Sequence, residues 1–114
     1  MEPMKTAVVF VHGLFLSGAE FTLLRRRLVA GHGFEAHRFS YPTVRGSLTV
    51  TLQNLADFVA RIDAERIHFV GHSLGGVVLS RYFERERDGR EGRVVMLGSP
   101  LVGSRSAAVA SIGT

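Results

Sequence analysis

Four short apolar segments alternate with three segments of helical periodicity, and this alternation limits the possible folds more than any other feature. Strands are predicted at residues 6–11, 34–40, 66–70 and 93–97. Strands joined by helices run parallel through right-handed crossovers. The first strand is apolar throughout, which is typical of a strand covered on both faces. The sequence therefore predicts an α/β fold, a doubly wound and mostly parallel sheet with helices on both faces.

Local signals predict where the helices lie. A capping box at residues 17–20 begins the first helix, and Gly31 and Gly33 end it. Tyr41-Pro42 predicts a turn after the second strand. The third helix is predicted to end near residue 88. The inward-facing positions are expected to be Phe21, Leu24 and Leu28 in the first helix, Leu52, Leu55, Val59 and Ile62 in the second, and Leu74, Val77, Val78 and Tyr82 in the third.

The third strand runs directly into Gly71-His72-Ser73-Leu74-Gly75, and a helix follows. A Gly-x-Ser-x-Gly segment between a strand and a helix is typical of a sharp turn that presents a catalytic serine. We expect Ser73 to have a positive φ. A Cβ two residues before or after such a serine is expected to clash with it, so Gly71 and Gly75 would both be required. Ser73 is therefore the candidate nucleophile.

A second loop is expected at the same edge of the sheet, because the carboxyl ends of parallel strands lie together. His12-Gly13 follows the first strand, and Gly13 would let the main chain approach Ser73 without a side chain between them. Acyl transfer needs main-chain N–H donors for the oxyanion. The candidate donors are the amides of Leu14 and Leu74, with His12 and Gly13 shaping the loop.

These segments together resemble the α/β-hydrolase superfamily, and within it small bacterial lipases and esterases. The resemblance extends from Thr6 to about Ser106. It implies a serine hydrolase of carboxylic esters with Ser73 as nucleophile, a small-molecule ester or acyl substrate, and no metal or organic cofactor. The segments that carry it are Val9-Phe10-Val11-His12-Gly13-Leu14, Tyr41-Pro42, Val70-Gly71-His72-Ser73-Leu74-Gly75-Gly76, Leu97-Gly98-Ser99-Pro100 and Gly103-Ser104.

The sequence departs from this superfamily after the nucleophile. In the superfamily an acid and then a histidine follow the serine on later loops. Here the last histidine is His72, which is expected to point away from Ser73 across the turn. His12 is then the most plausible internal base, whereas His32, His37 and His68 are expected to be structural or surface residues. The only later acids are Glu84, Glu86, Asp88 and Glu91.

Because no triad acid and histidine are evident after Ser73, the sequence predicts a single domain over residues 1–114, incomplete at its carboxyl terminus and truncated after the fourth strand. Such a chain is expected to be weakly active or inactive as an esterase. The fourth strand would leave an open sheet edge, which makes self-association possible. Two alternatives stay open: a non-catalytic, truncated or degenerate hydrolase domain, and an acyltransferase or thioesterase on the same scaffold.

Composition excludes several other classes of protein. The chain has no cysteine, so disulfides and thiol chemistry are not expected. The net charge is +4, but the arginines alternate with acids and no nucleic-acid motif accompanies them. No apolar run is long enough to span a membrane. The apolar stretch near the amino terminus is interrupted by His12-Gly13 and lacks a clean cleavage site, so a cytoplasmic protein is expected.

Overall fold

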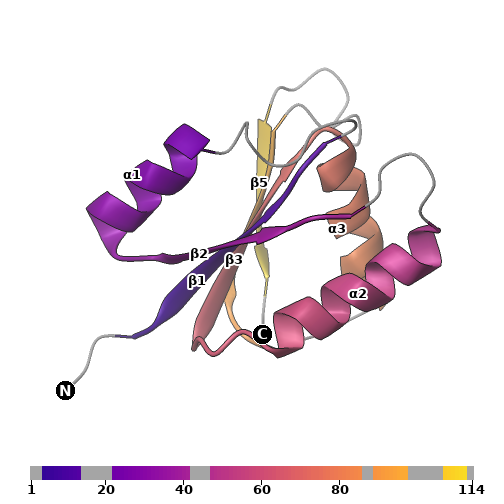
Figure 1. Cartoon of the computed structure of the whole chain (residues 1–114), viewed down its shortest axis with the longest axis horizontal. Helices are drawn as coiled ribbons and strands as arrows, with labels where there is room; N and C mark the ends of the chain where they lie inside the picture. Colours follow the sequence, from indigo (N-terminus) through magenta and orange to yellow (C-terminus); the bar gives the residue numbers. More distant parts are fainter. Residues whose placement is uncertain (1–3, 14–21, 42–46, 86–88, 98–106, 113–114) are drawn as a thin grey trace.

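The computed structural model describes residues 4–13, 22–41, 47–85, 89–97 and 107–112, in which five strands form one sheet. Strands lie side by side in the order β2-β1-β3-β4-β5 (Figure 1). Along the chain the elements are β1 (Thr6–Val11), α1 (Thr22–His32), β2 (Glu35–Phe39), α2 (Leu48–Ala60), β3 (Arg66–His72), α3 (Leu74–Arg85), β4 (Gly92–Leu97) and β5 (Ala107–Ile112).

The first four strands are parallel, so their carboxyl ends lie at one edge of the sheet. Val11 is in register with Phe39 of β2 and with Gly71 of β3, and His72 is in register with Leu97 of β4. We call this the carboxyl edge, and the opposite edge, where the same strands begin, the amino edge. The predicted doubly wound α/β architecture is confirmed.

Helix α1 lies on one face of the sheet and helices α2 and α3 on the other (Figure 1). The core correspondingly has two unequal parts, one on each face. Ala7, Val9 and Val11 of β1 face α2 and α3, whereas Val8 and Phe10 face α1. Residues 7–11 are all at most 1% exposed, which agrees with the prediction of a strand covered on both faces. The larger cluster contains Leu52, Leu55, Val59, Ile62, Val78, Leu79 and Tyr82, while α1 contributes the partly buried Leu24 and Leu28 to the smaller one.

The prediction that the sheet stops at the fourth strand is wrong. β5 pairs antiparallel with β4 along its whole length, from Gly92 opposite Ile112 to Leu97 opposite Ala107. The edge of β4 that was expected to be open is therefore hydrogen-bonded. Residues 107–112 contain no strong strand signal other than Val109 and Ile112, and pairing with β4 supplies the context that their composition lacks.

Several boundaries differ from the predicted ones by one or two residues. β3 continues to His72, two residues further than predicted, because it pairs with β4 up to Leu97. α2 ends at Ala60, so the buried Ile62 lies beyond the helix. Gly33 ends α1 with φ +67° and donates its amide to the Val29 carbonyl at 3.0 Å, as the glycine signal indicated. In α3, Leu79 is buried and Leu74 and Val77 only partly so.

Other predicted features lie outside the described residues. These are the capping box at residues 17–20, Phe21, Pro42, and residues 86–88 at the predicted end of the third helix.

Candidate functional site

Ser73 is a single turn residue between β3 and α3, at the carboxyl edge. Its φ is +55°, and among the described residues no other non-glycine residue has a positive φ. The Ser73 amide donates to the Leu97 carbonyl at 2.9 Å, and its carbonyl accepts from the Gly76 amide at 3.0 Å. The expected conformation is therefore present. A left-handed residue with a side chain costs about 1–3 kcal/mol and persists where its surroundings enforce it.

Gly71 and Gly75 are both required by close main-chain contacts, but for a reason that differs from the predicted one. A Cβ on Gly71 would lie 2.9 Å from main-chain atoms of Gly75 and Gly76 at the start of α3. A Cβ on Gly75 would overlap the Val11 carbonyl oxygen of β1 and lie 2.8 Å from that of His12. The nearest obstacles are thus α3 and β1, rather than Ser73. These glycines let the start of α3 lie directly against two strands.

The loop that follows β1 touches the Ser73 turn. A Cβ on Gly13 would lie 2.9 Å from the His72 carbonyl oxygen and 3.1 Å from Ser73 Cβ. The imidazole of His72 lies on the same side, with its Nδ1 3.5 Å from that position. The two segments that sequence analysis placed at one edge are therefore in contact. The absence of a side chain at Gly13 permits this contact.

Main-chain amides are available at this point. Leu74 is the first residue of α3, where N–H groups have no acceptor within the helix. Within the described part of the chain no hydrogen bond uses the Leu74 amide. The partial positive charge of a helix amino terminus also favours negative charge there. The other candidate donor, Leu14, lies outside the described residues.

His12 is buried, with 2% of its surface exposed, and both of its ring nitrogens are hydrogen-bonded. The Tyr41 amide donates to Nε2 at 3.2 Å, so Nε2 carries no proton. Nδ1 lies 2.9 Å from the Gly13 carbonyl oxygen and is then the protonated nitrogen, donating to that oxygen. With both nitrogens engaged in this way, His12 has no lone pair for the Ser73 proton. Its contacts are those of a residue that shapes the loop.

The other histidines have partners away from Ser73. His32 stacks on Phe34, and His37 Nε2 lies 3.1 Å from Glu35 Oε1. His68 Nδ1 accepts the Arg93 amide at 2.9 Å, and burial, together with the charges of Arg66 and Arg93, lowers the pKa of His68. These contacts agree with the expected structural roles.

The later acids do not reach the carboxyl edge within the described part of the chain. Glu84, near the end of α3, pairs with Arg81 at 3.5 Å, and Glu91, just before β4, pairs with Arg66 at 3.5 Å. Glu86 and Asp88 lie outside the described residues. Glu84 and Glu91, the two later acids that the structure describes, are therefore not triad partners of Ser73.

The described residues contain no cluster of His, Cys, Asp or Glu arranged to hold a metal ion. In those same residues, no helix has both the length and the apolar character needed to cross a membrane.

Comparison with known proteins identifies the family of this chain. The model of the alpha/beta hydrolase family matches residues 8–113, and the chain belongs to this family. No curated protein matches the sequence.

Two solved structures share the fold. The ydeN gene product of B. subtilis is 24% identical, with a TM-score of 0.64 over 83% of this chain and 52% of its own. A proposed ydeN-like hydrolase (eca3091) from Pectobacterium atrosepticum is 15% identical, with a TM-score of 0.60 over 88% of this chain and 53% of its own. The chain thus spans about half the length of these structures.

One contributor to the site was not predicted. Tyr41 was interpreted as part of a turn and of the resemblance, with no role in the site, yet its ring stacks on His12, with centroids 4.4 Å apart and planes 18° apart. No local signal could identify it, because the two residues are 29 positions apart and meet only when β1 and β2 pair.

Proposed function

We propose that this chain carries the nucleophile and the oxyanion-binding part of a serine hydrolase that acts on carboxylic esters. Ser73 Oγ would attack the ester carbonyl carbon. The amides of Leu74 and Leu14 would donate hydrogen bonds to the oxyanion that forms. The observation that carries this proposal is the strained φ of +55° at Ser73, held between β3 and α3 and in contact with Gly13.

The local electrostatics fit these roles. The Ser73 turn lies at the amino terminus of the 12-residue helix α3, whose dipole favours a developing negative charge. Donors that are already oriented stabilise an oxyanion without reorganisation during the reaction, and each is worth about 10²–10³ in turnover. This stabilisation requires no metal or organic cofactor.

The rate is expected to be low, because no base for the Ser73 proton is identified among the described residues. His12 has both nitrogens bonded, and no histidine follows His72 in the sequence. Loss of a triad member lowers turnover by about 10⁴–10⁶ and leaves the contribution of the oxyanion hole and of binding. The same observation favours the second candidate, a non-catalytic hydrolase domain.

Reaction with p-nitrophenyl acetate, a short-chain activated ester, separates the two candidates. We expect slow release of p-nitrophenol and an acetyl adduct on Ser73, detected by mass spectrometry of proteolytic peptides. Ser73→Ala should remove both signals. If wild type and Ser73→Ala release product equally and no adduct forms on Ser73, the chain is a non-catalytic domain. Adding a thiol or amine acceptor to the same assay distinguishes transfer from hydrolysis.

A further inference from the structure

Tyr41 and His12 hold each other through a reciprocal pair of hydrogen bonds. The Tyr41 hydroxyl donates to the main-chain carbonyl of His12 at 2.7 Å. In return, the main-chain amide of Tyr41 donates to Nε2 of the His12 side chain at 3.2 Å. The two rings stack between these bonds. Each side chain therefore fixes the main chain of the other residue.

This pair joins segments that are far apart in sequence and lie just beyond the ends of β1 and β2. Val11 and Phe39 are the last residues of β1 and β2 in register, so the ladder described between the two strands ends there. Beyond that point, a side chain that bonds to a main-chain carbonyl can hold the two segments together. The burial of His12 makes these bonds stronger than they would be in water.

The His12 carbonyl is also one of the atoms against which the Ser73 turn packs. A Cβ on Gly75 would lie 2.8 Å from it, and the next residue, Gly13, lies against His72 and Ser73. Any displacement of His12 therefore moves the surface on which the start of α3 rests. Tyr41 is linked to that surface by the shortest hydrogen bond of the pair.

We propose that Tyr41 is a positioning residue, which acts through His12 to hold the His12-Gly13 main chain against the Ser73 turn. Its role in catalysis rests on the proposed function. Correct placement of an oxyanion donor matters only in the transition state, so loss of this support should lower kcat and leave KM little changed.

Tyr41→Phe tests the proposal, because it removes the hydroxyl and keeps the stacked ring. Arg90→Lys is the matched control: it weakens hydrogen bonds to the carbonyls of Val59, Ile62 and Ala64 at the amino edge, away from Ser73. Both variants should lose stability in urea unfolding. Only Tyr41→Phe should shift the amide NMR resonances of Ser73, Leu74 and Gly75, and only it should lower kcat for p-nitrophenyl acetate, by about tenfold.

The outcomes separate the two proposals. Unchanged Ser73–Gly75 resonances in Tyr41→Phe, or the same shifts in Arg90→Lys, would show that Tyr41 only stabilises the fold. Shifted resonances in a protein whose wild type lacks any Ser73-dependent reaction would support the positioning of the turn and reject the esterase function. Shifted resonances with an unchanged kcat would overturn the catalytic role of Tyr41.

Discussion

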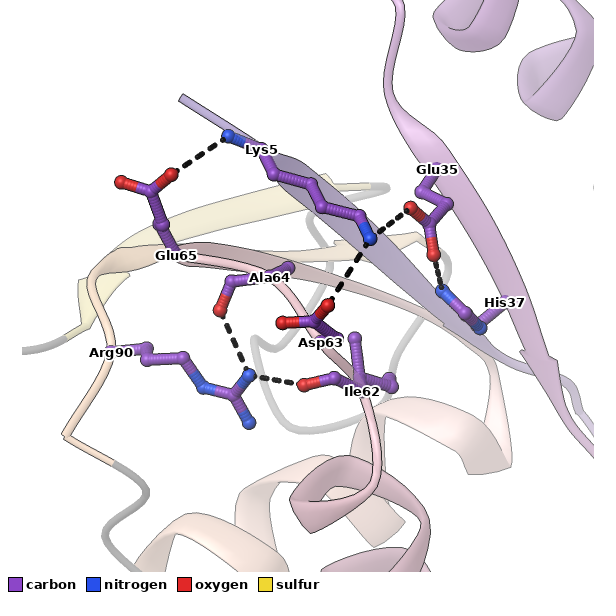
Figure 2. A network of polar contacts seen from close by, with 8 residues as sticks. All are labelled: Lys5, Glu35, His37, Ile62, Asp63, Ala64, Glu65 and Arg90. Carbon is purple, nitrogen blue, oxygen red and sulfur yellow. Dashed lines mark hydrogen bonds and ion pairs between the residues drawn. The ribbon is translucent and has the colours of Figure 1, made fainter. Parts of the chain in front are cut away.

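The two edges of the parallel sheet are held together by different kinds of contact. At the carboxyl edge, main-chain atoms approach one another closely at Gly13, Gly71 and Gly75, and the buried His12 is hydrogen-bonded to Tyr41. At the amino edge, exposed side chains form a network (Figure 2). Lys5 Nζ lies 3.3 Å from Glu35 and 3.6 Å from Asp63.

The two edges are expected to differ in how well they tolerate amino-acid substitutions. Exposed ion pairs contribute about 0–1 kcal/mol in proteins generally, and their side chains can be exchanged without moving the main chain. The hydrogen bond and charge of Glu35, with a smaller effect of Asp63, raise the pKa of Lys5, but this lysine is exposed to solvent. Main-chain contacts through glycine allow no such exchange. The candidate site therefore lies at an edge where close main-chain contacts constrain the atomic positions.

Two residues at the amino edge depart from this division. The Arg90 guanidinium donates to the carbonyls of Ile62 at 2.6 Å and Ala64 at 3.0 Å, just after α2 ends (Figure 2). It also donates to the carbonyl of Val59, in the last turn of α2, at 2.9 Å. Positive charge is favourable at a helix carboxyl terminus. A Cβ on Gly92 would overlap the Ile67 carbonyl oxygen. The amino edge thus also contains one close main-chain contact.

Of the variants proposed, Gly75→Ala is expected to have the largest effect on stability. The new Cβ overlaps main-chain atoms of β1, which cannot rotate away, so we expect a loss of about 3 kcal/mol or more. Gly31→Ala is the control, because a Cβ there meets nothing within 4 Å and α1 should gain up to about 1 kcal/mol. Urea unfolding of both variants measures the difference. Equal stability of the two variants would mean that the main chain at the carboxyl edge shifts at little cost to accommodate the new Cβ.

Arg90→Met should cost at least about 2 kcal/mol, because a single hydrogen bond from a charged group is worth about 1.5–3 kcal/mol and the guanidinium donates to the carbonyls of Val59, Ile62 and Ala64. Lys5→Met, which breaks only exposed ion pairs at the same edge, should be indistinguishable from wild type in the same unfolding assay. A larger effect of the Lys5 variant would reverse the proposed contrast between main-chain bonding and exposed charge pairs.

Ser73→Gly tests the strain at the turn. Glycine adopts positive φ freely, so this variant should be more stable than Ser73→Ala by about 1 kcal/mol. Neither variant should form an acetyl adduct at position 73. Calorimetric unfolding of the two proteins gives the comparison, and a more stable alanine variant would argue against strain at this residue.

The smallest expected effect is on the pH dependence of stability. His68 has a lowered pKa in the folded protein, so the unfolded chain binds protons first as pH falls. Its contribution is present above the unfolded pKa of about 6.5 and is lost as pH falls through the lower folded value. His68→Gln keeps a side-chain acceptor for the Arg93 amide without a titrating ring. The free energy of unfolding of both proteins should be measured between about pH 7.5 and 5, and it should fall less steeply with pH for the variant.

Much of the fold could be predicted from local patterns. Three predictions depended only on neighbours within a few residues, and each agrees with the structure. They are the apolar run of β1, the inward-facing apolar positions of α2 and the glycine that follows α1. β5 could not be predicted in this way, because its strand conformation depends on pairing with β4. The boundaries of β3 and α2 also depend on contacts with distant segments.

In the candidate site, too, some features could be predicted from contiguous sequence, whereas others depend on distant segments. Ser73 and its conformation could be inferred because the strand, the Gly-x-Ser-x-Gly segment and the helix are contiguous in the sequence. The reason for Gly75 could not, because the atom it avoids belongs to β1. The hydrogen bonds of His12 could not be predicted either, because its partners are fixed only in the folded chain. These bonds engage both ring nitrogens, so the ring is interpreted as structural rather than as a base.

The sequence by itself determined the alternation of strands and helices, the serine turn and the absence of any histidine after His72, since all three are properties of contiguous segments or of composition. Only the tertiary structure decided which main-chain atoms surround Ser73, which hydrogen bonds engage His12, and how Tyr41 joins the ends of β1 and β2. The physical reason is that close packing and buried hydrogen bonds depend on distances between residues remote in sequence. Those distances exist only once the strands have paired.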